Sequence, residues 1–283
     1  MLLSFNRPSM AWTLDGVGAS WLTDADALTN GRPASAARLQ WLSGVQDLTS
    51  TLTLRGSWTT PFAPRLLGLV GLTLPAGTLV SLAFRRPADA GYTYAPGAPS
   101  QRITSLPNGS RVAWFALPAG LDSVIGVEFR IANDVNGAAA IAAGQVFEIG
   151  EAWIGPTVDL PHETDWSRGT TDPTALRRSK GGQLFGVVAR PWRTLNLRLS
   201  VAPQSAIAGG GLDGGWDWEQ VEASLAGGAR CAVVPRWLGM TVTNLQRSAL
   251  VCAATTQGPV QHAGGNLFGR EYVFEEIPAA SAA

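Results

Sequence analysis

Tryptophan is the residue type in this chain whose abundance and placement suggest a specific chemistry. The 283 residues include 11 Trp and only three Tyr. An indole ring buries a large apolar area and keeps one polar N–H, so Trp serves in sheet packing, in subunit interfaces and as a stacking platform for sugar rings. A Trp that begins or ends a strand is more often a core or interface residue. The candidate carbohydrate or interface aromatics are Trp12, Trp21, Trp41 and Trp58.

Histidine and cysteine give no recognisable catalytic or metal-binding pattern. His162 and His262 are isolated and match neither H-x-x-x-H nor H-E-x-x-H, and Cys231 and Cys252 lack C-x-x-C spacing. No G-x-S-x-G nucleophile elbow is present. A triad assembled from distant positions, with one of the two His as base, remains an alternative. We expect no metal site and no catalytic residues.

A cluster of carboxylates offers another possible chemistry, because paired acids hydrolyse glycosides. Helix capping and a solvated helix face explain these side chains better. The cluster consists of Asp213, Asp217, Glu219 and Glu222.

The glycine-rich segment 209–215 contains a formal match to the dinucleotide fingerprint. Gly209, Gly211 and Gly214 fit G-x-G-x-x-G. The surrounding pattern is strand–turn–strand rather than βαβ, so we interpret the segment as a flexible loop. The chain also has no G-x-x-x-x-G-K-[ST] motif. We therefore expect no cofactor and predict that the protein is not an enzyme.

Composition limits the possible partners. Basic and acidic residues balance at 21 each, and the net charge of zero gives no general attraction to nucleic acid or to an anionic membrane. The longest apolar run, Leu66 to Leu74, is far shorter than the roughly 20 residues that cross a bilayer. Met1 to Phe5 is followed by a polar Asn-Arg-Pro step, so we expect no export signal. Cys231 and Cys252 either pair across neighbouring strands or stay as buried free thiols.

The first half of the chain has the pattern of many short strands separated by turn residues. Alternating or continuously apolar segments are bounded by Gly, Pro, Asn and Ser, which favours an antiparallel sandwich or jelly roll. The Asn30-Gly31 step predicts a tight turn that leads Trp41 into the sandwich or to its edge, and Asn108-Gly109-Ser110 predicts another turn. The expected strand segments are 51–58, 64–74, 75–84, 111–120, 123–131 and 145–155.

The second half is also β-rich, with one clear helix. Trp218, Val221 and Leu225 fall at helical spacing within residues 216–225, and Asp213 or Asp217 can cap this helix. Strands are expected on both sides of Pro191 and at 230–235, 248–254 and 269–277. We predict domains at residues 1–156 and 175–283, joined by a linker at 157–174 that has mixed charge and no period.

The first domain resembles galactose-binding-like (discoidin-type) jelly rolls. The segment "LTNGRPASAARLQW" (28–41) is similar to the turn and Trp-bearing strand that begin such domains. The segment "QVFEIGEAWIG" (145–155) is similar to their closing strand, which returns beside the first. The family's ligand loops are too variable for any residue role to be transferred. The resemblance implies a β-sandwich over residues 1–156.

The whole chain also resembles minor tail proteins of long-tailed bacteriophages. Segments such as "GRPASAARLQWLSG" (31–44) and "FEIGEAWIGP" (147–156) carry this similarity in the first half. "SKGGQLFGVVARPWRTLNLRLSV" (179–201) and the stretch 235–278 carry it in the second, and are also similar to distal-tail and tail-tip ring proteins.

This second resemblance implies a structural virion protein of the tail tip or baseplate. Such a protein assembles in the host cytoplasm into a ring or collar that contacts other tail proteins, and the β-rich second domain would be its assembly domain. Trp and Arg suit the subunit contacts of a closed ring with heterologous interfaces. The alternative is a carbohydrate-binding module that attaches the virion to host surface glycans through the first domain.

Overall fold

The computed structural model has a mainly β fold, as predicted. It describes residues 1–15, 18–32, 34–42, 51–136, 140–164, 166–187, 190–235 and 239–278. Contacts divide the chain into two compact units. The larger unit contains Leu2–Val158 and Ala232–Ala249, and the smaller one contains Met1, Asp159–Cys231 and Leu250–Pro278. The predicted division, with a linker at 157–174, stays a prediction about independent folding.

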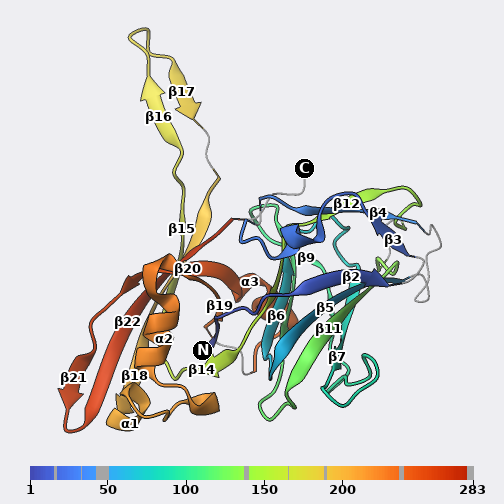
Figure 1. Ribbon diagram of the computed structural model, residues 1–283. Helices are drawn as coiled ribbons and strands as arrows, with labels where there is room; N and C mark the ends of the chain where they lie inside the picture. The colour runs from blue at the N-terminus through green and yellow to red at the C-terminus, as the bar shows by residue number, and fades with distance from the viewer. Residues whose placement is uncertain are drawn as a thin grey trace. The chain divides into compact units, whose positions relative to one another are not determined.

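A five-stranded antiparallel sheet forms one layer of the larger unit (Figure 1). The alternation in residues 51–58 predicts its longest strand, and every second residue there is buried. β11 pairs with β5 on one side and with β7 on the other. In spatial order the strands are β2 (Ala11–Asp15), β5 (Thr51–Phe62), β11 (Val124–Ala132), β7 (Leu79–Arg85) and β8 (Ser100–Arg102).

The second layer contains a strand that is buried on both faces, as its continuous apolar pattern predicts. All five residues of β6 (Leu66–Val70) are buried. β6 belongs to a four-stranded sheet in the order β13 (Glu151–Ile154), β6, β10 (Arg111–Ala116) and β9 (Thr104–Ser105). Phe115 of β10 and Phe129 of β11 pack across the two layers, with ring centroids 6.4 Å apart. The predicted sandwich is therefore present.

A three-stranded sheet completes the larger unit's core. It has the order β12 (Val146–Ile149), β4 (Ala37–Trp41) and β3 (Ala19–Trp21). Gly31 has φ +81°, and the Asn30 side chain accepts a hydrogen bond from the Arg32 N–H at 2.7 Å. The predicted turn is thus confirmed, and after the short 3₁₀ helix Ala25–Leu28 it leads to β4, where Trp41 is fully buried. Gly109, with φ +80°, confirms the second predicted turn.

The expectation of one closing strand at residues 145–155, beside the first strand, is wrong. The segment forms two strands, because the chain changes sheets at Gly150, whose N–H donates to the Gly71 carbonyl at 3.1 Å. β12 pairs with β4, and β13 pairs with β6. The first strand, β1 (Leu2–Ser4), lies between β14 (Thr157–Asp159) and β19 (Arg230–Val234).

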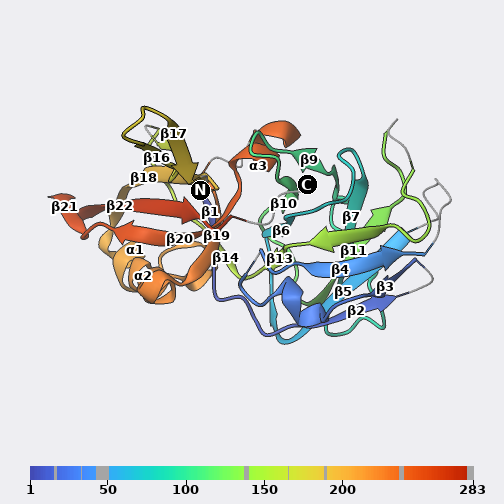
Figure 2. The same ribbon diagram turned by 90° about the horizontal axis from the view of Figure 1, so that it is seen from above.

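The smaller unit has a sheet in the order β20 (Leu250–Gln257), β22 (Leu267–Glu276), β18 (Trp192–Pro203) and β15 (Ser167–Thr171), and β21 (Gln261–Gly264) adds to β22. Figure 2 shows α1 (Gln204–Ile207) and α2 (Trp218–Leu225) together against these strands. The predicted helix is confirmed. Asp217 is its N-cap, in a capping box with Gln220, and Trp218, Val221 and Leu225 are its buried residues.

A two-stranded hairpin extends away from this sheet (Figure 1). It consists of β16 (Ala175–Arg178) and β17 (Leu184–Val187), and the strand predicted before Pro191 is therefore present. The two cysteines also lie in the smaller unit, on the neighbouring strands β19 and β20. Both are buried free thiols with their Sγ atoms 3.5 Å apart. Burial raises the pKa of the Cys252 thiol well above its ordinary value.

Helix α3 (Val242–Ser248) of the larger unit is attached to the sandwich by one buried side chain. Gln246 is fully buried, and its Oε1 accepts from the backbone N–H of Trp114 at 2.6 Å. Its Nε2 donates to the Trp114 carbonyl at 2.7 Å. One amide group thus satisfies both backbone groups of a residue in β10, as a neighbouring strand would.

We predict that Gln246→Leu destabilises the larger unit by about 2 kcal/mol or more, because a buried polar group without a partner costs about 1–3 kcal/mol and two are created. Urea unfolding followed by tryptophan fluorescence measures the change. Gln183→Leu on the exposed hairpin is the matched control, with an expected change within about 0.5 kcal/mol. Equal stability of the two variants would show that the Gln246 amide does not hold α3.

Candidate functional site

The four tryptophans singled out from the sequence occupy two kinds of environment in the larger unit. Trp41 is fully buried, and Trp12 and Trp58 are 7% and 5% exposed. Trp21 is half-buried at the end of β3. The structure brings Trp12, Trp41 and Trp58 into one hydrophobic core, and Trp21 packs at its margin. A carbohydrate or interface role for these residues stays a prediction, and the accessible indole among them is that of Trp21.

The residues considered for catalysis have other partners. The Asp217 carboxylate caps α2, and the hydrogen bond from the Gln220 N–H is the main cause that lowers its pKa. Glu222 forms a two-pronged ion pair with Arg270, at 2.7 Å for each contact. His262 lies 2.5 Å from the Gly265 carbonyl and contacts the Phe268 ring edge-on. Among the residues that the structure describes, no group of three His, Cys, Asp or Glu could hold a metal ion.

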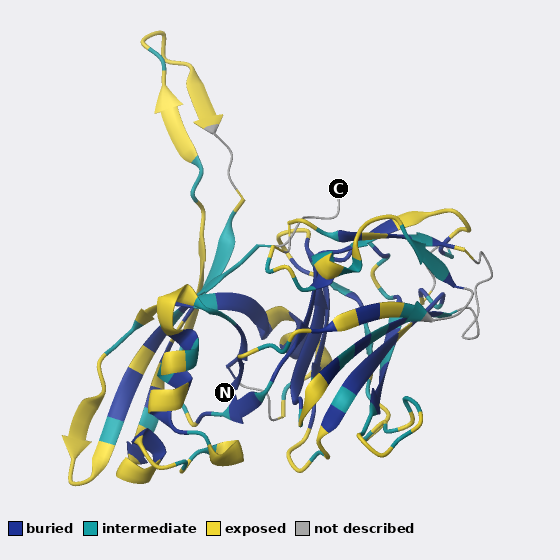
Figure 3. Cartoon of the chain, in the orientation of Figure 1, coloured by how far each residue is buried: buried dark blue, intermediate teal, exposed yellow. Residues whose placement is uncertain are grey.

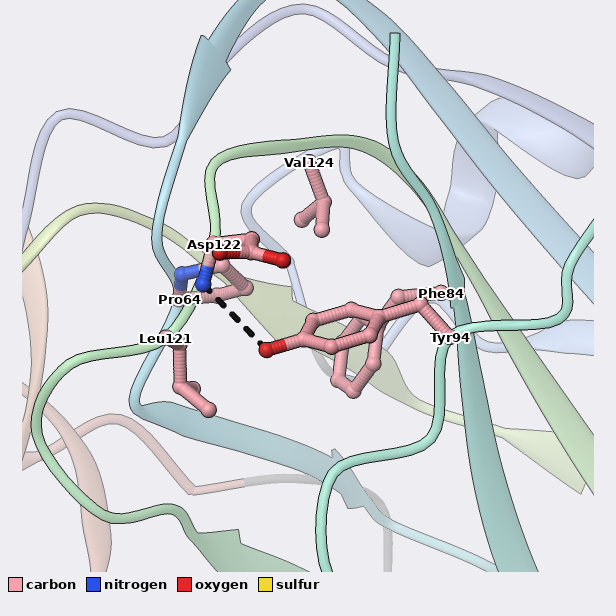
Figure 4. Close-up of a pocket in the computed structure, with 6 residues that line it drawn as sticks. All are labelled: Pro64, Phe84, Tyr94, Leu121, Asp122 and Val124. Carbon is pink, nitrogen blue, oxygen red and sulfur yellow. Dashed lines mark hydrogen bonds between the residues drawn. The ribbon is translucent and has the colours of Figure 1, made fainter. Parts of the chain in front are cut away.

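A small recess opens where three strands of the larger unit end or begin (Figure 4). β7 ends at Arg85, β5 ends at Phe62, and β11 begins at Val124. The space at the recess is about 140 Å³, open solvent included. Enclosed ligand pockets measure roughly 300–1,000 Å³, so the recess is a shallow surface depression that a ligand would cover rather than enter. Its lining residues are Pro64, Phe84, Tyr94, Leu121, Asp122 and Val124.

Tyr94 is fixed at the wall of the recess by backbone and side-chain contacts. Its backbone pairs with that of Phe84 in both directions, with N···O distances of 2.7 and 3.1 Å. Its hydroxyl accepts from the Asp122 backbone N–H at 3.2 Å, as the dashed line in Figure 4 marks. The loop that follows β7 is thereby joined to the loop that precedes β11.

Arg86 holds the same two loops together by charge. Its guanidinium lies over the Tyr94 ring at 5.0 Å. Two of its nitrogens, Nε and Nη2, donate to Asp89 at 2.9 and 3.0 Å, and Nη1 donates to Asp122 at 3.2 Å. These hydrogen bonds lower the pKa of Asp89 and raise that of Arg86. The Asp122 side chain is 56% exposed, so its carboxylate faces solvent at the edge of the recess.

This arrangement suits a ligand with an apolar face and polar edges. Phe84 and Val124 are each only 1% exposed and belong to the core, so the half-buried Leu121 and Tyr94 supply contact for the apolar face. The Asp122 carboxylate and the Arg86 guanidinium supply an acceptor and donors. This site is not among those predicted from the sequence. Its residues come from three separate loops and strands, and the pairing of Arg86 with Asp89 three residues later was the one local signal.

Comparison with known proteins finds only distant similarity. No family model and no curated protein matches the chain. One similar solved structure is CBM32-1 from a family 31 glycoside hydrolase of Clostridium perfringens, at 11% identity and a TM-score of 0.30, covering 53% of this chain and 96% of that one. Another is a fucolectin from striped bass (Morone saxatilis) serum, at 11% identity and a TM-score of 0.28, covering 96% and 92%.

These values are too low to align binding residues, so the site rests on its own geometry. The fold is that of a mainly β protein with a sandwich unit, and the recess is a candidate binding site on the surface of this unit. Within the described part of the chain, no helix has the length and apolar character of a membrane span.

We predict that Arg86→Gln raises the pKa of Asp89 toward its ordinary value of 3.8, because the hydrogen bonds that lower it are lost. A carboxyl with a lowered folded pKa stabilises the fold above its unfolded pKa, and this contribution disappears as pH falls through the folded pKa. In the wild type the loss therefore occurs below about pH 4. Carboxyl-carbon NMR titration measures the change.

Asp134 is the internal control for this titration. Its pKa is also lowered, chiefly by a hydrogen bond from Arg102 rather than Arg86, so Arg86→Gln leaves it unchanged. An Asp89 titration that is the same in wild type and variant would contradict the assigned role of Arg86.

Proposed function

We propose that the larger unit is a non-catalytic carbohydrate-binding module of the galactose-binding-like kind. The observation that carries the proposal is the shallow recess at the half-buried Tyr94 ring, with Leu121 beside it and the charged side chains of Arg86 and Asp122 at its edge. A pyranose ring has the same division, since its C–H face is apolar and its hydroxyls donate and accept hydrogen bonds. The sequence resemblance of residues 28–41 to galactose-binding-like jelly rolls also supports it.

A second candidate function, in assembly, is favoured by the hairpin of the smaller unit. Its described side chains are almost all exposed, as Figure 3 shows in yellow. Leu176, Leu184 and Phe185 are 63%, 56% and 56% exposed. In the register of the hairpin, Leu176 and Leu184 lie on one face and Phe185 on the other. An isolated two-stranded hairpin is marginally stable in water, so both faces favour a protein partner.

We propose that this partner is a second copy of the chain and that the protein is a structural component of a phage tail tip or baseplate. The sequence segment 179–201, which resembles tail-tip ring proteins, begins in this hairpin. Assembly into a ring or collar, contact with other tail proteins and location in the virion are parts of this proposal. The two functions are compatible, because an assembled protein can also display a sugar-binding unit.

We predict that Tyr94→Ala weakens glycan binding about tenfold or more, because one stacking surface and one wall of the recess are removed. Binding of the purified full chain is first detected on a glycan array and then measured by calorimetry. Tyr94→Phe retains the aromatic ring, and it serves as the folded variant with which Tyr94→Ala is compared. Val146→Ala, at an apolar side chain of the same unit that is 40% exposed, is the matched control and leaves affinity unchanged. No array hit for the wild type, or equal affinity in Tyr94→Ala, would refute the module assignment.

We predict that replacing Leu176, Leu184 and Phe185 together with Ser converts oligomers of the full chain into monomers, because the apolar contacts of the hairpin are lost. Light scattering measures the mass. Leu22→Ser, at a side chain 48% exposed in the larger unit, is the control and retains the oligomer. A wild-type chain that stays monomeric at high concentration and binds no tail partner would exclude this function.

Lys180 allows an independent check of the same contact, because it is the only lysine in the sequence and lies on the exposed hairpin. An amine-reactive photo-cross-linker attached there is expected to yield covalent dimers whose cross-links start from the hairpin.

A further inference from the structure

The outward face of the five-stranded sheet carries a cluster of arginines around one acid and one tyrosine. Strand alternation directs Leu54, Phe84 and Phe129 into the core, so their neighbours face the other side of the sheet. Register places Glu128 of β11 opposite Arg55 of β5, and Gly126 of β11 opposite Arg85 of β7. The outward cluster consists of Arg55, Arg85, Tyr92, Gly126, Glu128 and Arg130.

Tyr92 lies flat against the sheet within this cluster. A Cβ atom on Gly126 would stand 3.0 Å from both Cε1 and the hydroxyl oxygen of Tyr92, so the ring occupies the space that a side chain at position 126 would need. The Arg55 and Arg85 guanidinium groups are 5.1 and 5.6 Å from the ring centroid. The ring thus supports both cations by cation–π contact.

The cations of the cluster are unequally neutralised. Glu128 is only 1% exposed and accepts from Arg55 at 2.6 Å and also from Arg130. Arg85 has no ion pair or hydrogen-bonded carboxylate among the residues that the structure describes, and its Nε is buried without a hydrogen-bond partner there. The next residue, Arg86, has two carboxylates. Arg85 is therefore the arginine of the cluster that has no carboxylate partner among the described residues, whereas Arg55 and Arg130 share Glu128.

We propose that Arg85 is the anchor of an oxyanion-binding site on this face, separate from the Tyr94 recess. A half-buried guanidinium without a carboxylate partner is unfavourable, and its terminal N–H donors match the oxygens of a sulfate, phosphate or carboxylate group. The Tyr92 ring lies against the Arg85 guanidinium. The positive charges of Arg55 and Arg130 add to the electrostatic potential at the site. The ligand class is a small oxyanion, free or as a substituent of a larger ligand.

Sulfate is the probe, and the Arg side-chain Nε–H signals in nitrogen–proton NMR spectra are the readout. Titration of the full chain with sodium sulfate is compared with sodium chloride at equal ionic strength, which removes simple screening. We expect the Arg85 Nε–H signal to shift in a saturable way with sulfate alone. We expect Arg85→Gln to weaken sulfate binding, read from the nearby Arg55 and Arg130 signals, about tenfold or more, since hydrogen bonds to charged groups are the strong ones.

Arg38→Gln is the matched control, because Arg38 is an exposed arginine of the same unit, 54% exposed and paired with Glu148. It retains sulfate binding. Unchanged backbone amide spectra of Arg85→Gln away from the sheet face show that the variant is folded. Sodium acetate and methyl phosphate titrations then tell whether the site prefers a planar carboxylate or a tetrahedral oxyanion. A sulfate response no larger than that of chloride, or one that persists in Arg85→Gln, would overturn the proposal.

Discussion

The hydrogen bonds between the Gln246 amide and the Trp114 backbone hold together parts of the larger unit that are 132 residues apart in sequence. β6 is buried on both faces, and the Trp114 ring lies directly on Gly68, where an added Cβ would be 2.4 Å from the ring. Helix α3 lies beside β10, and its buried Gln246 amide gives both backbone groups of Trp114 a partner.

The pairing of arginine with buried acids is a second constraint on the structure. Among the described residues, the two most deeply buried acids each pair with arginine. Glu128 and Glu151 are each 1% exposed. Glu151 accepts from Arg7 at 2.5 Å, and the Arg7 guanidinium also lies over the Trp153 ring at 5.3 Å. A buried carboxylate is stable only with a well-oriented partner, and the planar guanidinium can pair and stack at once. Almost all the chain's basic residues are Arg, and these sites use properties that Lys lacks.

The sequence predicts those strands and helices whose local hydrophobic pattern matches the burial of their residues in the structure. Alternation reveals β5 and β11, continuous apolarity reveals β6, and apolar residues at helical spacing behind a capping Asp at 213 or 217 reveal α2. β15 and α3 are among the elements that the sequence does not predict, because their pattern carries no such signal. β15, Ser167–Thr171, contains no apolar residue, and the buried residues of α3 include the polar Gln246 and Ser248. Pairing with β18 and contact with β10 stabilise these segments, and such long-range contacts are invisible in a local window.

The candidate site is less predictable than the fold, because its residues take their roles from the path of one loop. At the end of β7, Phe84 faces the core, Arg85 faces the outer sheet surface, and Arg86 leaves the strand. The following loop then returns Tyr92 to the Arg85 side and Tyr94 to the Phe84 side. Two arginines and two tyrosines that are almost adjacent in sequence thus build two different surfaces. Where a scaffold fixes the strand ends and the loops carry the functional residues, one loop can supply residues to two surfaces. The spacing of these residues in the sequence does not reveal this arrangement.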